Sequence, residues 1–408
     1  MILPASTSPA STPPASTPIG WPLLRLGFRP FYLAAATFAA LSIPLWIAIY
    51  LGALSVPQGS ALSPLLWHAH EMLFAFAATV IIGFLLTAGK AWTGLPTPRG
   101  AALGALALLW LLARLAALLA AHDFSYYVLY AALDLALLPI VAIVLLRLLL
   151  RAGNRRNLPL AVLLFLLTLA NLAFHAAVWG ALPVPPVRPL YAALGLIVMI
   201  ETVMAGRVVP AFTANATPGL RININPRLEV ATLSVTALAL VLWIFMDAFH
   251  LLSALAFAAA ALLQLARQKQ WAPAVTRDRP ILWILHVAYA WISLGFALLA
   301  LAQFQVVSPS LGVHALAVGA TGGLIIGMIT RTARGHTGRP LQVSKSEVLA
   351  YALVLVAAVL RALVPALIPA AFVPALIAAA LAWSAAFVIY LRIYGPWLAQ
   401  TRLDGKDG

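Results

Sequence analysis

Long runs of apolar residues constrain this chain more than any other feature of its sequence. Charged residues make up 9% of its 408 residues, whereas a soluble domain has about 25%. A helix that crosses a bilayer needs about 20 consecutive apolar residues. Twelve such runs lie near 30–52, 65–88, 101–121, 125–148, 158–180, 188–213, 228–248, 250–267, 281–304, 311–333, 348–367 and 371–394. The sequence therefore predicts an all-α polytopic membrane protein with about twelve transmembrane helices.

The two ends of the chain are more polar than this helical region. The opening MILPASTSPASTPPASTPIG repeats a PAST-like unit and lacks the basic and apolar segments of a signal peptide. Its composition is typical of a disordered segment. We expect a Pro/Ser/Thr-rich cytoplasmic tail over 1–24, a transmembrane domain over 25–396 and a short polar cytoplasmic tail over 397–408.

Basic residues gather on one side of the predicted membrane domain. All but three of the 25 Lys and Arg residues fall at the chain ends or in the connections after even-numbered spans, the exceptions being Arg114, Arg188 and Arg361. By the positive-inside rule, both termini lie in the cytoplasm. The net charge of +15 therefore reflects the orientation of the spans in the membrane. The lipid bilayer is the expected partner, and nucleic acid is not.

Histidines in the apolar spans are the first candidates for function. A rise of 1.5 Å per residue places His68, His70, His175 and His314 at a similar depth, near the outer face. Ionisable groups inside a membrane mark functional sites by default, and imidazole is a common ligand of metals and haem. The chain has no cysteine, so thiolate sites are excluded. This layer predicts a His-ligated cofactor, although His175 alone is as well explained by a hydrogen bond to a neighbouring carbonyl.

Two further histidines lie deeper in the predicted membrane domain. His286 falls in an inner layer of the ninth span, and His336 follows the tenth span at the cytoplasmic edge. We expect them to mark an inner centre or to contact the edge of a haem. His122 and His250 fall in outer connections, where we expect them to be solvated or to lie at the membrane interface.

The segment WHAHEM sets a constraint on its two histidines. Residues i and i+2 of a helix point about 200° apart, so His68 and His70 must face different partners. Glu71 lies at i+3 from His68, close enough to accept a hydrogen bond that fixes its tautomer. HAHE is not the HExxH pattern of zinc proteases.

Other polar residues fall in the apolar spans. Arg114 and Asp134 lie at similar depth on neighbouring spans, and we expect them to pair. Glu201 lies in mid-membrane without an obvious partner, which makes it a candidate proton-relay group. Arg207 and Arg331 lie near inner span ends, where they are topology charges or contacts for an anionic group such as a haem propionate.

An internal repeat relates the second span to the tenth. Shifting the chain by 244 residues aligns 70–96 with 314–340 and matches seven of 27 residues, among them His70 with His314. A shift of half that length aligns Gly83 to within one position of Gly206 in the sequence. The pattern favours three pseudo-symmetric four-helix units that place spans two, six and ten around a common centre. His70 would then face His314, as a six-coordinate haem requires.

Several motifs along the chain resemble the NnrS family of bacterial membrane proteins. They are RLGFRPFYL (25–33), WHAHEMLFAF (67–76), GFLLTAGKAWTG (83–94), GRVVPAFTANA (206–216), LHVAYAWISLGF (285–296) and the segment from HALAVGATGG to TRTARGHTGRP (314–340). The resemblance implies a haem protein of the cytoplasmic (inner) membrane that also contains copper and is linked to nitric oxide defence. The motif histidines are His68, His70, His286, His314 and His336.

A more distant similarity is to the catalytic subunits of haem–copper oxidases, which carry low-spin haem between histidines of spans two and ten. In HAHEMLFAF, a histidine followed by Met at i+4 and an aromatic residue at i+6 is similar to their second span. That register favours His68 as the ligand, whereas the repeat favours His70. Both remain open. The oxidases' copper site has no counterpart here, because spans six and seven lack histidine.

Two classes of function follow from these residues. The first is a haem b protein, with copper as a second metal, that binds or reduces nitric oxide with His314 and either His68 or His70 as ligands. Whether it is an oxidoreductase with its own electron donor stays open. The alternative is a proton-coupled secondary transporter whose site lies between repeats and contains His70, Glu71, Glu201 and His314.

Overall fold

The computed structural model describes residues 20–55, 60, 62–120, 124–245 and 248–406, and within these it contains helices and no strand. Twelve helical segments are long and apolar enough to cross a membrane. The prediction of an all-α protein with twelve spans is therefore confirmed. The PAST-rich segment 1–19 and His122 lie outside the described residues.

The spans follow one another in an up-and-down order. A short turn, η1 (Pro22–Leu24), precedes the first six spans, which are α1 (Phe28–Tyr50), α2–η2–α3 (Pro64–Glu71, Met72–Ala77, Ala78–Thr93), α4 (Ala101–Leu119), α5 (Phe124–Arg151), η3–α6 (Arg155–Asn157, Leu158–Val178) and α7 (Val187–Ala216). The last six are α8 (Pro226–Phe245), α9 (His250–Lys269), η4–α10 (Pro273–Thr276, Pro280–Ala302), α11–η5–α12 (Pro309–His314, Ala315–Gly322, Gly323–His336), α13–η6–α14 (Lys345–Ala358, Val359–Leu363, Val364–Leu367) and η7–α15 (Pro369–Ala371, Phe372–Ala399).

The second and tenth spans begin and bend in the same way. Each starts with a Ser–Pro pair in which the serine side chain caps the helix and the proline takes the first helical position. Each then changes from α-helix to π-helix next to the aligned histidine, in η2 after His70 and Glu71, and in η5 after His314. Because π-helical turns are rare and concentrate at functional sites, this shared irregularity supports the internal repeat.

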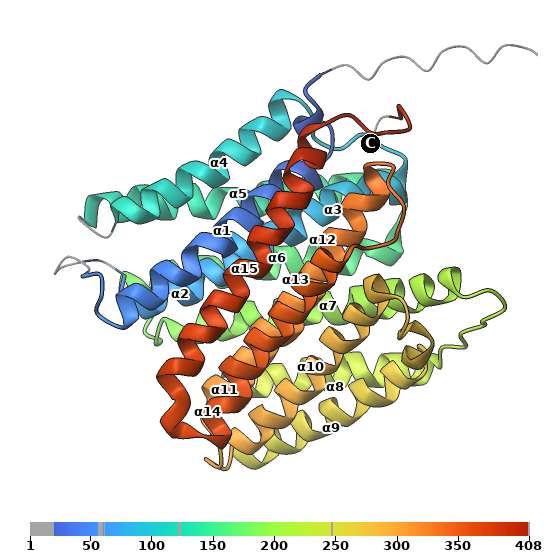
Figure 1. Ribbon diagram of the computed structural model, residues 1–408. Helices are drawn as coiled ribbons and strands as arrows, with labels where there is room; N and C mark the ends of the chain where they lie inside the picture. Colours follow the sequence, from blue (N-terminus) through green and yellow to red (C-terminus); the bar gives the residue numbers. More distant parts are fainter. Residues whose placement is uncertain (1–19, 56–59, 61, 121–123, 246–247, 407–408) are drawn as a thin grey trace, which may run out of the picture.

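The repeat-related spans occupy the middle of the bundle. In Figure 1, α4 and α5 lie at one edge and α8 and α9 at the opposite edge. The second and tenth spans are 78% and 72% buried, against 33% for α8. A cavity of about 90 Å³ lies between α3, α7 and α12, with Tyr32 and Glu201 among its mostly apolar lining. Spans two, six and ten therefore meet around one cavity, as the arrangement in three units requires.

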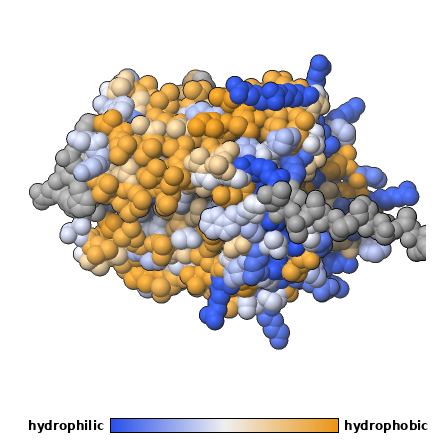
Figure 2. Space-filling model, turned by 90° about the horizontal axis from the view of Figure 1, so that it is seen from above, coloured by the Kyte–Doolittle hydropathy of each residue, from blue (hydrophilic) through white to orange (hydrophobic). Residues whose placement is uncertain are grey.

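The surface divides into an apolar belt and one basic end. Figure 2 shows hydrophilic side chains gathered at one end of the molecule, whereas hydrophobic side chains cover most of the rest. Both described chain ends lie at this basic end, where Arg29 of α1 donates to the carbonyl oxygens of Leu398 (2.8 Å) and Gln400 (2.7 Å). The opposite end is called the far end below. An apolar belt of this kind fits a protein surrounded by lipid.

Buried arginines at the helix contacts are compensated by carboxylates. Arg267 of α9 pairs with Glu229 of α8 at 2.5 Å, and Arg334 of α12 pairs with Glu347 of α13 at 2.6 Å. Removing one partner of a buried pair costs about 3–5 kcal/mol. Such pairs therefore fix which helices lie next to one another.

Candidate metal centre

Eight buried polar side chains form a cluster, called the polar cluster here, that joins four helices in the far half of the bundle. Each is at most 7% exposed. The members are His70 and Glu71 of α2, Arg114 of α4, Tyr127, Tyr130 and Asp134 of α5, and Asn171 and His175 of α6. Polar groups this deep need partners, because an unpaired one in hydrocarbon costs several kcal/mol.

Three members of the polar cluster have the geometry of a metal site. The Nε2 atoms of His70 and His175 each lie 3.5 Å from Oδ2 of Asp134. The three potential ligand atoms all lie within 4.8 Å of one another. A tetrahedral ion with bonds of about 2.0–2.1 Å holds its ligand atoms about 3.3 Å apart. The His70–Asp134–His175 triad is therefore a possible metal site.

The other nitrogen of each imidazole is fixed by a polar neighbour. Nδ1 of His70 lies 2.8 Å from the hydroxyl of Tyr130 and 3.1 Å from Oε1 of Glu71. Nδ1 of His175 lies 2.8 Å from the hydroxyl of Tyr127. When Nδ1 carries the proton, the Nε2 lone pair points at the carboxylate. Metal-binding histidines are usually oriented by such a hydrogen bond on the second nitrogen.

The charges of the polar cluster favour one additional cation. Glu71 and Asp134 are negative and Arg114 is positive, which leaves one negative charge when the imidazoles are neutral. Oδ1 of Asn171 lies 2.9 Å from Nε2 of His70, and its amide nitrogen donates to Asp134 at 2.6 Å. Both ring nitrogens of His70 therefore have polar partners within the polar cluster. A bound cation would neutralise the remaining negative charge.

Arg114 holds the two carboxylates together. It donates to Oε2 of Glu71 at 2.7 Å and also binds Asp134, so the expected Arg114–Asp134 pair is confirmed. Glu71 was expected to contact His68, but in the structure it contacts Arg114 and His70. Glu71 turns toward Arg114 and fixes the ring of His70, because a buried carboxylate gains more from a guanidinium than from a neutral imidazole.

His68 points away from the polar cluster, as the spacing predicted. Its ring stacks on Trp46 of α1, with 4.7 Å between ring centroids and 6° between planes. In the described part of the chain it makes no hydrogen bond. Arg361 on η6, one of the three arginines outside the basic end, lies within electrostatic range of the His68 ring.

His314 lies at the same end of the bundle as His68, within electrostatic range of it. Nδ1 of His314 lies 2.7 Å from the carbonyl oxygen of Ser310. A carbonyl only accepts, so Nδ1 carries the proton and Nε2 keeps a free lone pair. Arg361 also lies within electrostatic range of His314, and it donates to the hydroxyl of Ser310 at 3.2 Å. His68 and His314 are called the histidine pair below.

The two inner histidines lie on different helices. His286 of α10 forms a 3.0 Å hydrogen bond with Thr213 through Nε2, and its buried Nδ1 has no partner among the described residues. His336 packs against Phe28, with 5.5 Å between ring centroids. An inner centre that contains both stays a prediction.

The remaining predicted residues lie apart from the histidine pair. Glu201 accepts a hydrogen bond from Thr321 at 3.1 Å, a partner that the sequence did not indicate. The Arg331 guanidinium lies 3.8 Å from the centre of the Phe212 ring. Arg207 faces a pocket at the basic end.

Comparison with known protein families identifies the family to which the chain belongs. Residues 22–402 match the NnrS protein family. This chain belongs to the NnrS family. The match covers all twelve spans, and with them the polar cluster and the histidine pair. No curated protein matches the chain.

Sequence reasoning missed part of the site in this NnrS protein. Tyr127, Tyr130 and Asn171 were not singled out, although each contacts a histidine of the triad. The spacing of polar residues along these two spans did indicate such contacts. Tyr127, Tyr130 and Asp134 are three and four residues apart, and Asn171 and His175 are four apart, so each set shares one helix face. Two polar faces on neighbouring apolar spans indicate a buried polar contact.

Proposed function

We propose that this NnrS protein is a haem b protein of the bacterial cytoplasmic membrane that binds or reduces nitric oxide and holds copper as a second metal. Membership of a family associated with the nitric oxide response supports the substrate. The observation that carries the proposal is the division of the outer histidines into two sites, the histidine pair and the His70–Asp134–His175 triad. The position of the basic residues supports cytoplasmic termini.

The histidine pair is the proposed haem-binding site. Haem b supplies one-electron chemistry and is commonly held by imidazole. His314 suits this role because Ser310 fixes its ring and leaves Nε2 free. Among the described residues His68 has no competing hydrogen-bond partner, whereas His70 has both nitrogens engaged. The register that favours His68 over His70 is therefore adopted.

Arg361 is the proposed partner for a haem propionate. It interacts with both members of the histidine pair, and a guanidinium binds a carboxylate by two parallel hydrogen bonds. Arg331 lies 17 residues beyond His314, about 25 Å along the helix. It is therefore too distant for a haem at the far end, and its role beside an inner haem near His286 stays a prediction.

The difference between the two ligands suggests how nitric oxide reaches the iron. If both histidines held a haem, nitric oxide would bind the iron only after one of them withdrew. Ser310 anchors the ring of His314 by a hydrogen bond, whereas His68 stacks on Trp46 and makes no hydrogen bond to a described residue. We assign the withdrawing role to His68.

The triad is the proposed copper site. Two imidazoles suit copper, which binds nitrogen and oxygen ligands more tightly than other divalent first-row metals do. The polar cluster has one uncompensated negative charge, which would favour a bound copper cation. Glu71 and Tyr127 would orient the two imidazoles through Nδ1.

A visible absorption spectrum of the purified protein tests the proposal. Expression with added haem should give a Soret band that shifts when nitric oxide is added without oxygen. Replacing His314 by Ala should remove the band, and the matched variant His250→Ala should retain it, because His250 is exposed. A wild-type protein without a Soret band would contradict the proposal.

Consumption assays separate an enzyme from a binding protein. Reduction combines two nitric oxide molecules, two electrons and two protons into one nitrous oxide and one water. The electrons must come from an external one-electron donor or a quinol. Nitrous oxide formed in proportion to donor oxidised would establish reduction, and stoichiometric binding without turnover would establish a nitric oxide sensor or store.

Glu201 supports the alternative of a proton-coupled transporter. Its carboxyl group lines the central cavity between three repeat-related spans, where transporters of inverted-repeat fold place their sites. Proton uptake by proteoliposomes that is lost in Glu201→Gln would favour transport. A Glu201→Gln protein with normal haem content and no change in proton flux would favour the haem protein.

A further inference from the structure

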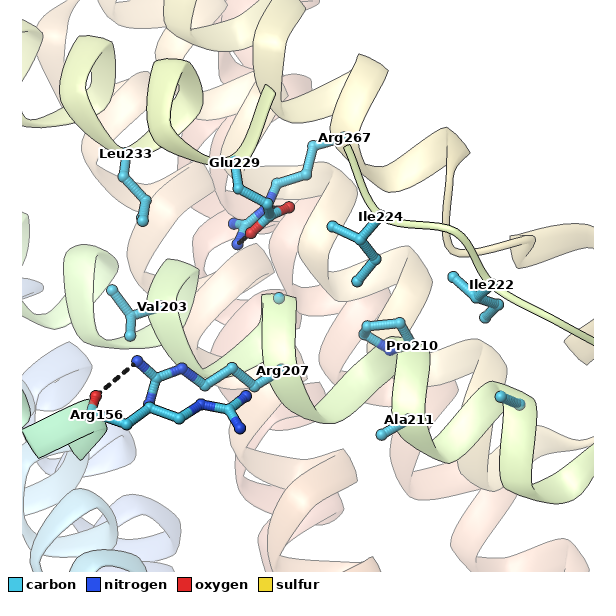
Figure 3. A pocket seen from close by; sticks show the side chains of 12 residues that line it. Arg156, Val203, Arg207, Pro210, Ala211, Ile222, Ile224, Glu229, Leu233 and Arg267 are labelled. Atoms are coloured by element: carbon cyan, nitrogen blue, oxygen red, sulfur yellow. Dashed lines mark hydrogen bonds and ion pairs between the residues drawn. The ribbon is translucent and has the colours of Figure 1, made fainter. Parts of the chain in front are cut away.

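A pocket of about 530 Å³ opens at the basic end of the bundle, away from the histidines. Figure 3 shows it between the inner parts of α7, α8 and α9 and the η3 turn that precedes α6. Three arginines line it, Arg156, Arg207 and Arg267, with Glu229 as the one acidic residue. The proposed function assigns nothing to this pocket.

One wall of the pocket is electrically neutral and rigid. Arg267 donates to both oxygens of Glu229, at 2.7 and 2.5 Å, and also to the Thr202 carbonyl and the Tyr289 hydroxyl, each at 2.9 Å. A Cβ atom added at Gly206 would overlap this guanidinium. The close approach of Arg267 to α7 therefore depends on glycine at position 206. Four of the five N–H donors of Arg267 are used, so it cannot bind an anion through two hydrogen bonds.

The opposite wall carries two positive charges without a counter-ion. Arg207 donates to Oδ1 of Asn157 at 2.6 Å and to the Arg156 carbonyl at 3.1 Å, both uncharged acceptors. The Arg156 side chain runs beside that of Arg207 (Figure 3), close enough for their charges to repel. In the described part of the chain neither has a carboxylate partner. Two neighbouring guanidiniums that repel each other are stabilised when an anion bridges them.

We propose that this pocket binds a phosphate group, either the headgroup of an anionic phospholipid or free phosphate. Each guanidinium has five N–H donors, and the two hydrogen bonds that Arg207 makes to Asn157 and to the Arg156 carbonyl leave most of them for a ligand. Apolar side chains of Val203, Pro210 and Leu233 continue the lining away from the arginines, which suits the glycerol and acyl part of a lipid. Basic pockets between helices on the cytoplasmic side of membranes bind such headgroups.

Binding to the full-length protein in detergent tests this site. Phosphatidylglycerol, phosphatidylcholine and inorganic phosphate would each be titrated while thermal unfolding is followed, and bound lipid would be counted by native mass spectrometry. Phosphatidylglycerol should raise the unfolding midpoint more than phosphatidylcholine does. Stabilisation by inorganic phosphate to the same extent would identify free phosphate as the source and equally support the site.

Charge-neutral variants locate the binding. Arg156→Gln with Arg207→Gln should weaken the response about tenfold or more, because it removes two charge-assisted sets of hydrogen bonds. The matched control removes two exposed charges that do not line the pocket, Arg151→Gln with Arg227→Gln, and should respond as the wild type does.

Two results would overturn the proposal. One is a wild-type protein that neither anionic probe stabilises. The other is a double variant that binds as tightly as the wild type, or a control variant that loses as much binding as the double variant. In either case the binding would depend on general surface charge and not on this pocket. If the double variant fails to fold, Arg156→Gln alone serves as the test. The exposed Arg156 side chain makes no hydrogen bond within the described residues, so this single variant should fold. It should still bind more weakly, because it lacks one of the two charges.

Discussion

His68 and His70 lie two residues apart on α2, yet their rings contact different parts of the bundle. The ring of His68 stacks on Trp46 at 4.7 Å between ring centroids, whereas Nε2 of His70 lies 2.9 Å from Asn171. One short motif thus contributes to two sites on opposite sides of its helix. The two histidines should therefore respond differently to every test of cofactor content.

Metal content should depend on the triad. Asp134→Asn and His175→Ala should each reduce copper or zinc bound per polypeptide by about tenfold or more, because each removes one of three protein ligands. Elemental analysis of the purified protein measures this. Metal should also dissociate as the pH falls, because protons compete for the imidazoles. His250→Ala serves as the control, and equal metal content in all variants would disprove a triad site.

Arg114 should be essential for stability. Arg114→Ala leaves Glu71 and Asp134 as two uncompensated carboxylates in the membrane interior, which should cost about 3–5 kcal/mol of unfolding free energy. The expected observation is a lower thermal-unfolding midpoint in detergent. Adding Glu71→Gln and Asp134→Asn should recover part of the loss. A single variant as stable as the wild type would contradict the charge assignment in the polar cluster.

Close packing around η5 gives a prediction that involves no charge. A Cβ atom at Gly319 would overlap the ring of Trp291, whereas one at Gly335 meets nothing within 4 Å. Gly319→Ala should therefore destabilise the protein by about 1–3 kcal/mol. Gly335→Ala should be neutral or slightly stabilising. Thermal unfolding of both variants checks this, and equal midpoints would argue against the π-helical packing on α10.

Arg361 should raise the reduction potential of a haem at the histidine pair. A nearby cation favours the reduced iron, which carries less positive charge, so Arg361→Gln should lower the midpoint potential. A spectroscopic redox titration of the Soret band measures the shift. Arg188→Gln is the matched control, because Arg188 also lies outside the basic end. A potential unchanged in Arg361→Gln would place the haem elsewhere.

The sequence predicted the architecture well because membrane spans are specified by composition and length. All twelve spans and the repeat of spans two and ten were visible in apolar runs and in the alignment of His70 with His314. The polar cluster was only partly predictable. The pair of Arg114 with Asp134 followed from equal depth, but depth does not give rotation about the helix axis. The contact of Glu71 with Arg114 depends on that rotation, and so does the direction in which each of His68 and His70 points.

The haem content of two neighbouring variants tests the central claim most directly. His68→Ala and His70→Ala would be purified after expression with added haem, and the Soret absorbance per polypeptide compared with that of the wild type. The account predicts that His68→Ala loses or markedly shifts the band, whereas His70→Ala retains it and loses the second metal. A Soret band lost in His70→Ala and unchanged in His68→Ala would contradict the division of the two histidines between separate sites.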